Sequence, residues 1–405
     1  MNNLQMHNHS RGTFSQQLMR DRNTMLLFNL VRKNEPISRA DLARCSGLSP
    51  ATVSILMENL IANEWIYESS ISVPAKERGR RPILLKVNAS RGFVATLEIL
   101  SRGYKCKLYD ICFHEVAFRR CYDIASSAEN ICGTLLALAA ENGIGEDRLL
   151  GIHVLFPGIF NLDTGELCYS AVIPSKNLIQ RNLIEYLRRR LPNTEVIINN
   201  NSAMVAYSEF INEDSVSALP LLAVTVREGL SGGIVLSDQH CMPLEVGHII
   251  IQQEGPLCRC GNRGCLETYC STPALFREIN RQTGLCLNYQ ENFGTDSNRD
   301  AMLKVAQAFD AGDPAVAAVL QEFASYLCSG IISLVNVFSA RSVHIGGDVY
   351  YLGKKFSEMV RKTLFQDFSI VTDTSELELE FFGDDIEQCR RAAVMMILKH
   401  IFCSN

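Results

Sequence analysis

Apolar residues in the first ninety positions follow two different spacings. From Met25 to Val31, and again from Val53 to Ile61, they recur every three to four residues, as on one face of an α-helix. A shorter helix is expected between them, over 39–46. From 65 to 88 apolar and polar residues alternate, which predicts a β-hairpin. The pattern therefore predicts three helices followed by a hairpin.

Capping residues mark where the second and third helices begin. Ser38 precedes one, with Asp41 three residues later, and Ser49 precedes the other, with Pro50 in its first position. Gly47 allows a tight turn between them. This is the helix-turn-helix pattern, in which the second helix enters the major groove of DNA. That helix begins with small, uncharged residues that we expect to meet DNA: Ser49, Pro50, Ala51, Thr52 and Ser54.

The predicted hairpin has a basic tip, "KERGRRP" at 76–82. Its cations resemble the wing of a winged helix-turn-helix and would meet phosphates or a minor groove: Lys76, Arg78, Arg80 and Arg81. A plain three-helix bundle is the alternative, and the basic tip favours DNA binding over it. Because the recognition helix has few long side chains, we expect methyl contacts and DNA shape to contribute to specificity.

Charge is divided unevenly along the chain. Residues 1–90 hold 12 Lys and Arg against 7 Asp and Glu, a net +5. Subtracting these from the totals of 39 and 44 leaves 27 basic and 37 acidic residues, a net −10 for the rest. A basic head on an acidic body indicates an anionic partner for the head.

Composition is that of an ordinary globular protein, with 47% hydrophobic and 20% charged residues. No apolar run reaches the roughly 18 residues that a membrane span needs, and the polar N-terminus lacks a signal-peptide core. We therefore expect no membrane insertion, a cytoplasmic location, and mostly free thiols among the 15 cysteines.

Beyond residue 90, strand-like and helix-like segments alternate, which predicts an α/β body with ligand sites at strand ends. Two longer amphipathic segments, 175–191 and 318–338, predict helices. The strand-like segments are "LLGIHVLFPGIF", "TEVIINNN", "LLAVTVRE", "GGIVLSD" and "ARSVHIGGD".

A short polar loop within 247–268 carries one histidine and three cysteines. His248, Cys258, Cys260 and Cys265 follow the spacing H-x9-C-x-C-x4-C. Imidazole and thiolates in this number are typical zinc ligands, and four protein ligands leave no open position. We therefore expect a closed, structural Zn²⁺ site. Four reduced residues without a metal are the alternative.

In four places the chain resembles the ROK family of repressors and sugar kinases. These are "PISRADLARCSGLSPATVS" in the head, "PGIFNLDTGEL", "EVGHI" and "CRCGNRGCLE". The resemblance covers nearly the whole chain, and its layout is that of the family's repressors. It implies an α/β protein with a winged helix-turn-helix over 1–90. Over 91–405 it implies a two-lobed, actin-like (ribonuclease-H-like) body that senses sugar and oligomerises, with a zinc loop at 245–267.

The resemblance also implies which residues meet the sugar. Glu245 and Glu267 match residues that accept hydrogen bonds from sugar hydroxyls. His248 matches a residue with one nitrogen on zinc and the other directed to a hydroxyl. Asn200 and Asn201 lie in the run "INNNSAMVAYSE", where kinases of the family carry their general base.

That run departs from a kinase. Counting back from Glu209 places Asn201 where the kinase needs an aspartate, and a one-residue shift would place Asn200 or Ser202 there. None of these can take a proton at neutral pH, although an asparagine can still hydrogen-bond a hydroxyl. Kinases of the family bind phosphate with two glycine-rich loops. In the matching segments of this chain, one keeps only Gly103 and the other reads "REGLSGGI". We therefore expect no enzymatic activity.

The sequence thus predicts a DNA-binding transcriptional repressor of carbohydrate uptake or metabolism genes. Its partners would be double-stranded operator DNA and a sugar or sugar phosphate effector, bound by a homodimer or homotetramer. Two alternatives stay open. The segment "SDQHCMPL" is shorter than the family's sugar loop, so the body could bind a protein partner instead. The chain could also be a sugar kinase with a DNA-binding head.

Overall fold

The computed structural model describes most of the chain in two compact units. Unit 1 comprises Met1–Leu155, Lys176–Ile198 and Ala393–Asn405, and unit 2 comprises Phe156–Ser175 and Asn199–Ala392. The head thus shares a unit with the first part of the body, and the domain boundary predicted at residue 90 stays a prediction. The described residues are 6–69, 82–100, 103–122, 127–160, 167–169, 179–213, 218–237, 240–289, 298–368, 377–383 and 386–403.

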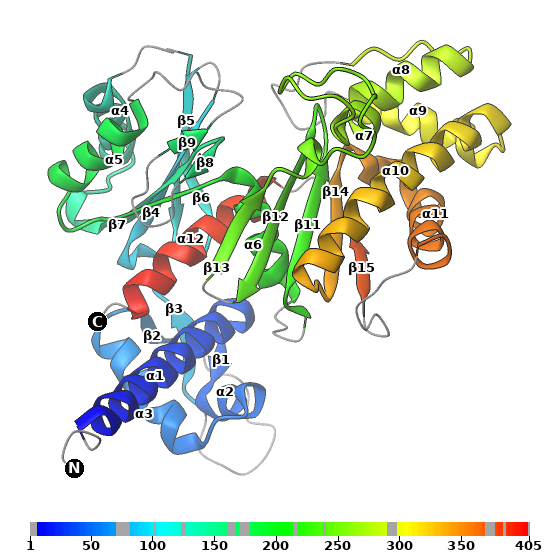
Figure 1. The fold of residues 1–405 in the computed structure, drawn as a ribbon. Helices are drawn as coiled ribbons and strands as arrows, with labels where there is room; N and C mark the ends of the chain where they lie inside the picture. The colour runs from blue at the N-terminus through cyan, green and yellow to red at the C-terminus, as the bar shows by residue number, and fades with distance from the viewer. Residues whose placement is uncertain are drawn as a thin grey trace. The chain divides into compact units, whose positions relative to one another are not determined.

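The head contains three helices and a small antiparallel sheet, as its apolar pattern predicts (Figure 1). The helices are α1 (Met6–Asn34), α2 (Arg39–Ser46) and α3 (Pro50–Ala62). The sheet order is β1 (Ile37–Ser38), β3 (Leu84–Val87), β2 (Ile66–Ser69). Helix α1 begins well before the apolar stripe at Met25. The tip of the predicted wing, with Lys76, Arg78, Arg80 and Arg81, lies outside the described residues.

The predicted helix caps are confirmed. The Ser38 hydroxyl accepts a hydrogen bond from the Asp41 backbone N–H at 3.1 Å and donates one to the Asp41 carboxylate at 2.6 Å. Hydrogen bonding to Ser38, followed by the charge of Arg44, lowers the pKa of Asp41. Gly47 ends α2 in the left-handed region, with φ of 69°. Ser49 accepts from the Thr52 N–H at 3.1 Å.

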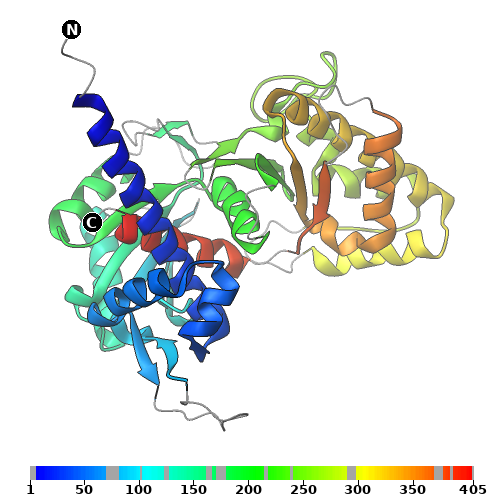
Figure 2. The same cartoon turned by 90° about the horizontal axis from the view of Figure 1, so that it is seen from below.

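The C-terminal helix packs into the core of the head. Helix α12 (Ile386–Cys403) carries Phe402, whose ring centroid lies 5.4 Å from that of Phe28 and 4.8 Å from that of Trp65. The Asn29 amide also donates to the Met395 sulfur at 3.6 Å. Helix α12 therefore lies beside the head (Figure 2), and aromatic rings from both segments pack together.

Unit 1 also holds a five-stranded sheet. Strands β4 (Phe93–Ile99) and β7 (Leu149–Leu155) are parallel, whereas β5 (Tyr104–Asp110) pairs antiparallel with both β4 and β6 (Glu115–Cys121). Helix α12 lies against this sheet, where a Cβ on Gly151 would come within 2.4 Å of Ile397. The helices of this part are α4 (Ala128–Glu141) and α5 (Ile179–Arg190). The strand order is β10 (Glu195–Asn199), β7 (Leu149–Leu155), β4 (Phe93–Ile99), β5 (Tyr104–Asp110), β6 (Glu115–Cys121).

Unit 2 is built on a second five-stranded sheet. Its order is β13 (His240–Leu244), β12 (Leu230–Ser237), β11 (Leu221–Val226), β14 (Ser342–Gly347), β15 (Glu378–Phe381). Strands β11, β14 and β15 are parallel, so their carboxyl ends share one edge. The helices are α6 (Asn201–Glu213), α7 (Glu267–Cys270), α8 (Thr272–Gln282), α9 (Arg299–Asp310), α10 (Pro314–Phe338) and α11 (Gly353–Gln366). A short ribbon pairs β8 (Ile159–Phe160) with β9 (Leu167–Tyr169).

Helix α10 is the central helix of unit 2. Within the described part of the chain it alone is long and apolar enough to cross a membrane, judged by length and composition. Half of the residues in its most apolar 18-residue stretch are buried, and the stripe from Val316 to Val335 belongs to the main core of the unit. A long apolar stripe is therefore accounted for by packing inside the unit.

Candidate ligand and metal site

The predicted metal loop folds back onto the chain that precedes it. The Leu266 N–H donates to the Ile249 carbonyl at 2.8 Å, and the Ile251 N–H donates to Gly264 at 2.9 Å. Gly264 has φ of 70°, and a Cβ there would lie 1.5 Å from the Gln252 carbonyl oxygen. Only glycine fits this approach. These hydrogen bonds and the close packing at Gly264 hold the two ends of the loop together.

His248, Cys258, Cys260 and Cys265 come together as the sequence spacing predicts. Their ligand atoms all lie within 4.8 Å of one another. Cys258 Sγ lies 3.7 Å from His248 Nδ1, and Cys260 Sγ lies 3.7 Å from Cys265 Sγ. Zinc–sulfur bonds of about 2.3 Å in a tetrahedron require sulfurs about 3.8 Å apart. The donor set and its spacing therefore fit a tetrahedral zinc ion.

The three thiols differ in their surroundings. Burial raises the pKa of Cys258 and of Cys265, whereas the backbone N–H of Asn262 lowers the pKa of Cys260. Without a cation, three clustered thiolates would repel one another, and a zinc ion would remove that repulsion by binding them. Zinc with three thiolates and a neutral histidine carries a net charge of −1.

Glu267, predicted to bind a sugar, is engaged by an arginine. Arg259 Nε lies 3.3 Å from Glu267 Oε1, and Arg259 Nη2 lies 3.2 Å from Oε2. The Glu267 side chain is only 8% exposed. Arg259 Nη1 also pairs with Glu228 at 3.2 Å, in the turn between β11 and β12. Arg259 therefore supplies the cation that this buried carboxylate needs.

Sequence reasoning missed this role of Arg259. The signal was present, because Arg259 stands between two predicted zinc ligands and Glu228 directly precedes Gly229 in a turn. Gly229 belongs to the same arrangement, since a Cβ there would lie 2.5 Å from Arg259 and 2.7 Å from Glu267.

His248 and Glu245 present their polar atoms on one side of the cluster. While Nδ1 of His248 faces the thiols, its Nε2 lies 3.9 Å from Glu245 Oε2. The Glu245 side chain is 45% exposed. This geometry allows the division that the resemblance implies, with Nδ1 on the metal and Nε2 available to a ligand hydroxyl. Glu245, His248 and Glu267 are thus brought together.

The two asparagines have different surroundings. Asn200 is buried, and its amide donates to the Gly158 carbonyl while its oxygen accepts from the Ser202 N–H at 2.7 Å. It therefore caps α6, and this use of its amide was not foreseen. Asn201 keeps a buried side-chain oxygen with no hydrogen-bond partner among the described residues. Buried polar atoms normally have partners, so this oxygen suits a ligand donor.

Helix α6 begins beside the strands that lead to Glu245. A Cβ on Gly233 of β12 would lie 2.3 Å from the Ser202 carbonyl, and the neighbouring Gly232 pairs with Leu244, just before Glu245. Further along α6, Glu209 Oε2 lies 3.0 Å from His344 Nδ1 on β14. This buried pair joins the helix to the sheet.

The carboxyl ends of β11 and β14 are occupied by the chain's own charged groups. Val226 pairs with Gly347, so Arg227 and Asp348 directly follow neighbouring parallel strands. Thr272 Oγ1 donates to Asp348 at 2.8 Å, and the Thr272 N–H donates to the Arg227 carbonyl at 2.7 Å. Burial raises the pKa of Asp348, while Thr272 and Arg227 oppose this effect. Open α/β sheets normally bind ligands at this edge.

The predicted DNA-facing residues lie at the start of α3. Ser49, Pro50 and Ala51 are exposed, Thr52 and Ser54 are half-buried, and Val53 faces the core. Ile55 is 61% exposed on the same helix, which the sequence reasoning did not single out. In the sequence, Ile55 could have been noticed because it is apolar but does not share the spacing of the residues that face the core.

The fold and the site together define a class of protein. It has a helix-turn-helix head and an α/β body, with a loop of one histidine and three cysteines that could hold a metal ion. The family model described as "ROK family" matches residues 126–378, and the chain belongs to this family.

Known relatives resemble either the whole chain or the body alone. A xylose repressor from Caldicellulosiruptor bescii is 26% identical, over 90% of this chain and 92% of the relative. A crystal structure of a ROK family transcriptional regulator, described as a homolog of the E. coli MLC protein, has a TM-score of 0.68 and 21% identity, covering 95% and 98%. A ROK hexokinase from Thermus thermophilus has a TM-score of 0.53 and 20% identity, covering 75% and 98%. The predicted fold class is confirmed.

Proposed function

We propose that this protein is a DNA-binding transcriptional repressor of carbohydrate uptake or metabolism genes. In this proposal a sugar or sugar phosphate bound by the body controls the affinity of the head for double-stranded operator DNA. The observation that carries it is a capped helix-turn-helix joined to a ROK body. Similarity to a named repressor over nine-tenths of the chain supports it.

We further propose that the body does not catalyse phosphoryl transfer. Asn201 stands where a kinase would need a carboxylate base, and an amide cannot accept the sugar proton. The two segments that resemble the family's phosphate loops have also lost glycines, since one keeps only Gly103 and the other carries Glu228. These residues favour ligand sensing over catalysis.

In the proposed effector site, Asn201, Glu245, His248 and Glu267 would hydrogen-bond sugar hydroxyls, while Asn200 positions α6. Zinc held by His248, Cys258, Cys260 and Cys265 would be structural, fixing the loop that presents Glu267. A sugar that binds one conformation of the protein more tightly than another would shift the protein between a DNA-competent and a released state.

Ser49, Pro50, Ala51, Thr52 and Ser54 would face the major groove, with Arg78, Arg80 and Arg81 on the wing. We propose a cytoplasmic homodimer or homotetramer, since two heads would read a two-fold symmetric operator.

The proposal is tested by selecting duplexes from a random pool with the full-length protein, then titrating the selected duplex with a panel of sugars and sugar phosphates. We expect a sequence with two related half-sites, and at least one compound that weakens its binding. Recovery of no enriched sequence would contradict DNA recognition. An enriched sequence insensitive to every compound would leave the head's role intact and favour a protein partner as the effector.

A further inference from the structure

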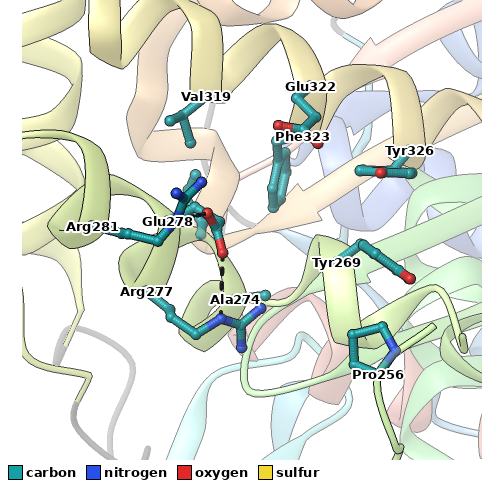
Figure 3. A pocket seen from close by; sticks show the side chains of 11 residues that line it. Pro256, Tyr269, Ala274, Arg277, Glu278, Arg281, Val319, Glu322, Phe323 and Tyr326 are labelled. Carbon is teal, nitrogen blue, oxygen red and sulfur yellow. Dashed lines mark hydrogen bonds and ion pairs between the residues drawn. The ribbon is translucent and has the colours of Figure 1, made fainter. Parts of the chain in front are cut away.

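A pocket of about 190 Å³ lies in unit 2, beside the zinc loop, and the proposed function does not use it (Figure 3). It is enclosed by the loop at Pro256, by α7 and α8, and by α10. Tyr269 lines it from α7, two residues after Glu267. Residues two apart on a helix point about 200° away from each other, so the pocket and the proposed effector site lie on opposite sides of α7.

The floor of the pocket is hydrocarbon. Ala274 and Leu275 are each 1% exposed, and Val319 and Phe323 are each 3% exposed. Tyr269 and Tyr326 form a wall, with ring centroids 4.6 Å apart and a tilt of 33°. An apolar, partly aromatic lining of this kind suits the hydrocarbon body of a small ligand.

The rim carries an excess of positive charge at one end. Glu278 accepts from Arg281 Nε at 2.8 Å, and its other oxygen lies 3.5 Å from Arg277 Nε. Two guanidinium groups therefore share one carboxylate. The contacts that Arg281 makes with described residues all come from Nε, which leaves both Nη groups available (Figure 3). Planar guanidinium groups bind carboxylates in a fork of two hydrogen bonds.

A single further carboxylate lines the pocket from α10. Glu322 lines the pocket beside Tyr326. A second negative group on a ligand would be repelled there, so charge orients a monoanion with its acid toward the arginines.

We propose that this pocket is a second ligand site, for a small monocarboxylic acid with an apolar body. The carboxylate would bind Arg277 and Arg281, and the body would pack on Phe323 and the two tyrosines.

Two hydrogen bonds join this pocket to the proposed effector site. Tyr269 Oη donates to Gln252 Oε1 at 2.7 Å, and Arg277 Nη2 donates to the Thr268 carbonyl at 3.1 Å. Gln252 lies in the loop closed by Gly264, and Thr268 follows Glu267 directly. A ligand that orders Tyr269 and Arg277 would therefore stabilise the segment that carries Glu267, and the two sites would influence each other.

The test uses the full-length, zinc-loaded protein with sodium benzoate as probe and benzamide as its uncharged counterpart. Binding is measured by calorimetry and by the shift in melting temperature. We expect benzoate to bind and to raise the melting temperature with concentration, and benzamide to bind at least tenfold more weakly, because it lacks the charge-assisted hydrogen bonds.

Arg281→Gln removes the charge from an exposed side chain and should weaken benzoate binding by about tenfold. Arg263→Gln is the matched control, an exposed arginine of the zinc loop outside the pocket lining, and should leave it unchanged. The proposal is overturned if benzoate does not bind, if benzamide binds equally well, or if Arg281→Gln binds benzoate as the unaltered protein does.

Discussion

The ring of Phe402 lies 4.8 Å, centroid to centroid, from the indole of Trp65, so helix α12 forms part of the core of the helix-turn-helix head. Trp65 is 7% exposed and Phe28, the third ring of the cluster, is fully buried. The last turn of α12 therefore stabilises the head, although the two are far apart in sequence.

Replacing Phe402 with Ala should lower the free energy of unfolding of unit 1 by about 1–3 kcal/mol. A fully buried Phe costs about 3–5 kcal/mol on truncation, and Phe402 is only half-buried. Chemical denaturation followed by Trp65 fluorescence measures the change directly, because this is the only tryptophan. Phe402→Leu, which keeps most of the apolar contact, should cost less. Equal stability of Phe402→Ala and the unaltered protein would exclude the aromatic cluster as a stabilising contact.

Purified protein that has not met a chelator should contain about one zinc per chain. Cys265→Ser should lose the metal and lower the melting temperature, because Cys265 is fully buried within the donor set. Cys286→Ser is the control, since Cys286 is exposed and lies outside the cluster. Elemental analysis checks both variants. Zinc retained at full stoichiometry in Cys265→Ser, or absent from the unaltered protein, would rule out this site.

Arg259→Met should weaken zinc binding and destabilise the loop. The change leaves Glu267 buried without its cation, next to a centre that carries a net −1 charge with zinc bound. The expected cost is about 1–3 kcal/mol, the range for a buried polar group that loses its partner. Competition with a chelator measures the zinc affinity, and thermal unfolding measures the stability. Arg263→Met, which removes an exposed arginine from the same loop, should change neither. If the two variants behave alike, Arg259 has no special role in neutralising Glu267.

The protein should not phosphorylate sugars in the presence of ATP, and Asn201→Asp should not restore that activity. A general base contributes about 10²–10⁴ to a rate, but the first phosphate-loop segment would still keep only Gly103, and the second would still carry Glu228. A coupled assay with a panel of hexoses and pentoses checks both forms. Sustained turnover by either one would show that a different carboxylate acts as base and that the body is a kinase.

Much of this fold was predictable from local signals. Ser38, Gly47 and Ser49 fix the helix boundaries of the head through short-range hydrogen bonds, and the apolar spacing fixes which face is buried. The histidine–cysteine cluster was equally predictable, because its three cysteines lie within eight positions and His248 is close in sequence. Local chemistry suffices where the partners are near along the chain.

Several of the missed features join residues far apart in sequence. Arg259 meets Glu228 across 31 positions, His344 meets Glu209 across 135, and Phe402 meets Trp65 across a longer span still. Only the folded sheet order brings these pairs together. The side-chain oxygen of Asn200 caps α6, which the residue type alone does not reveal, and its predicted contact with a sugar stays a prediction.

The most direct test of the account is the affinity of the full-length protein for its selected duplex as a function of salt. We expect the logarithm of the binding constant to fall linearly with the logarithm of salt concentration, since lysines and arginines displace ions from phosphates. Replacing Arg80 and Arg81 together with Ala should weaken binding and reduce the slope by roughly one to two ion equivalents. Unchanged affinity and slope in the double variant would contradict a DNA-binding wing. Failure of the unaltered protein to prefer the selected duplex over a scrambled one would contradict the repressor itself.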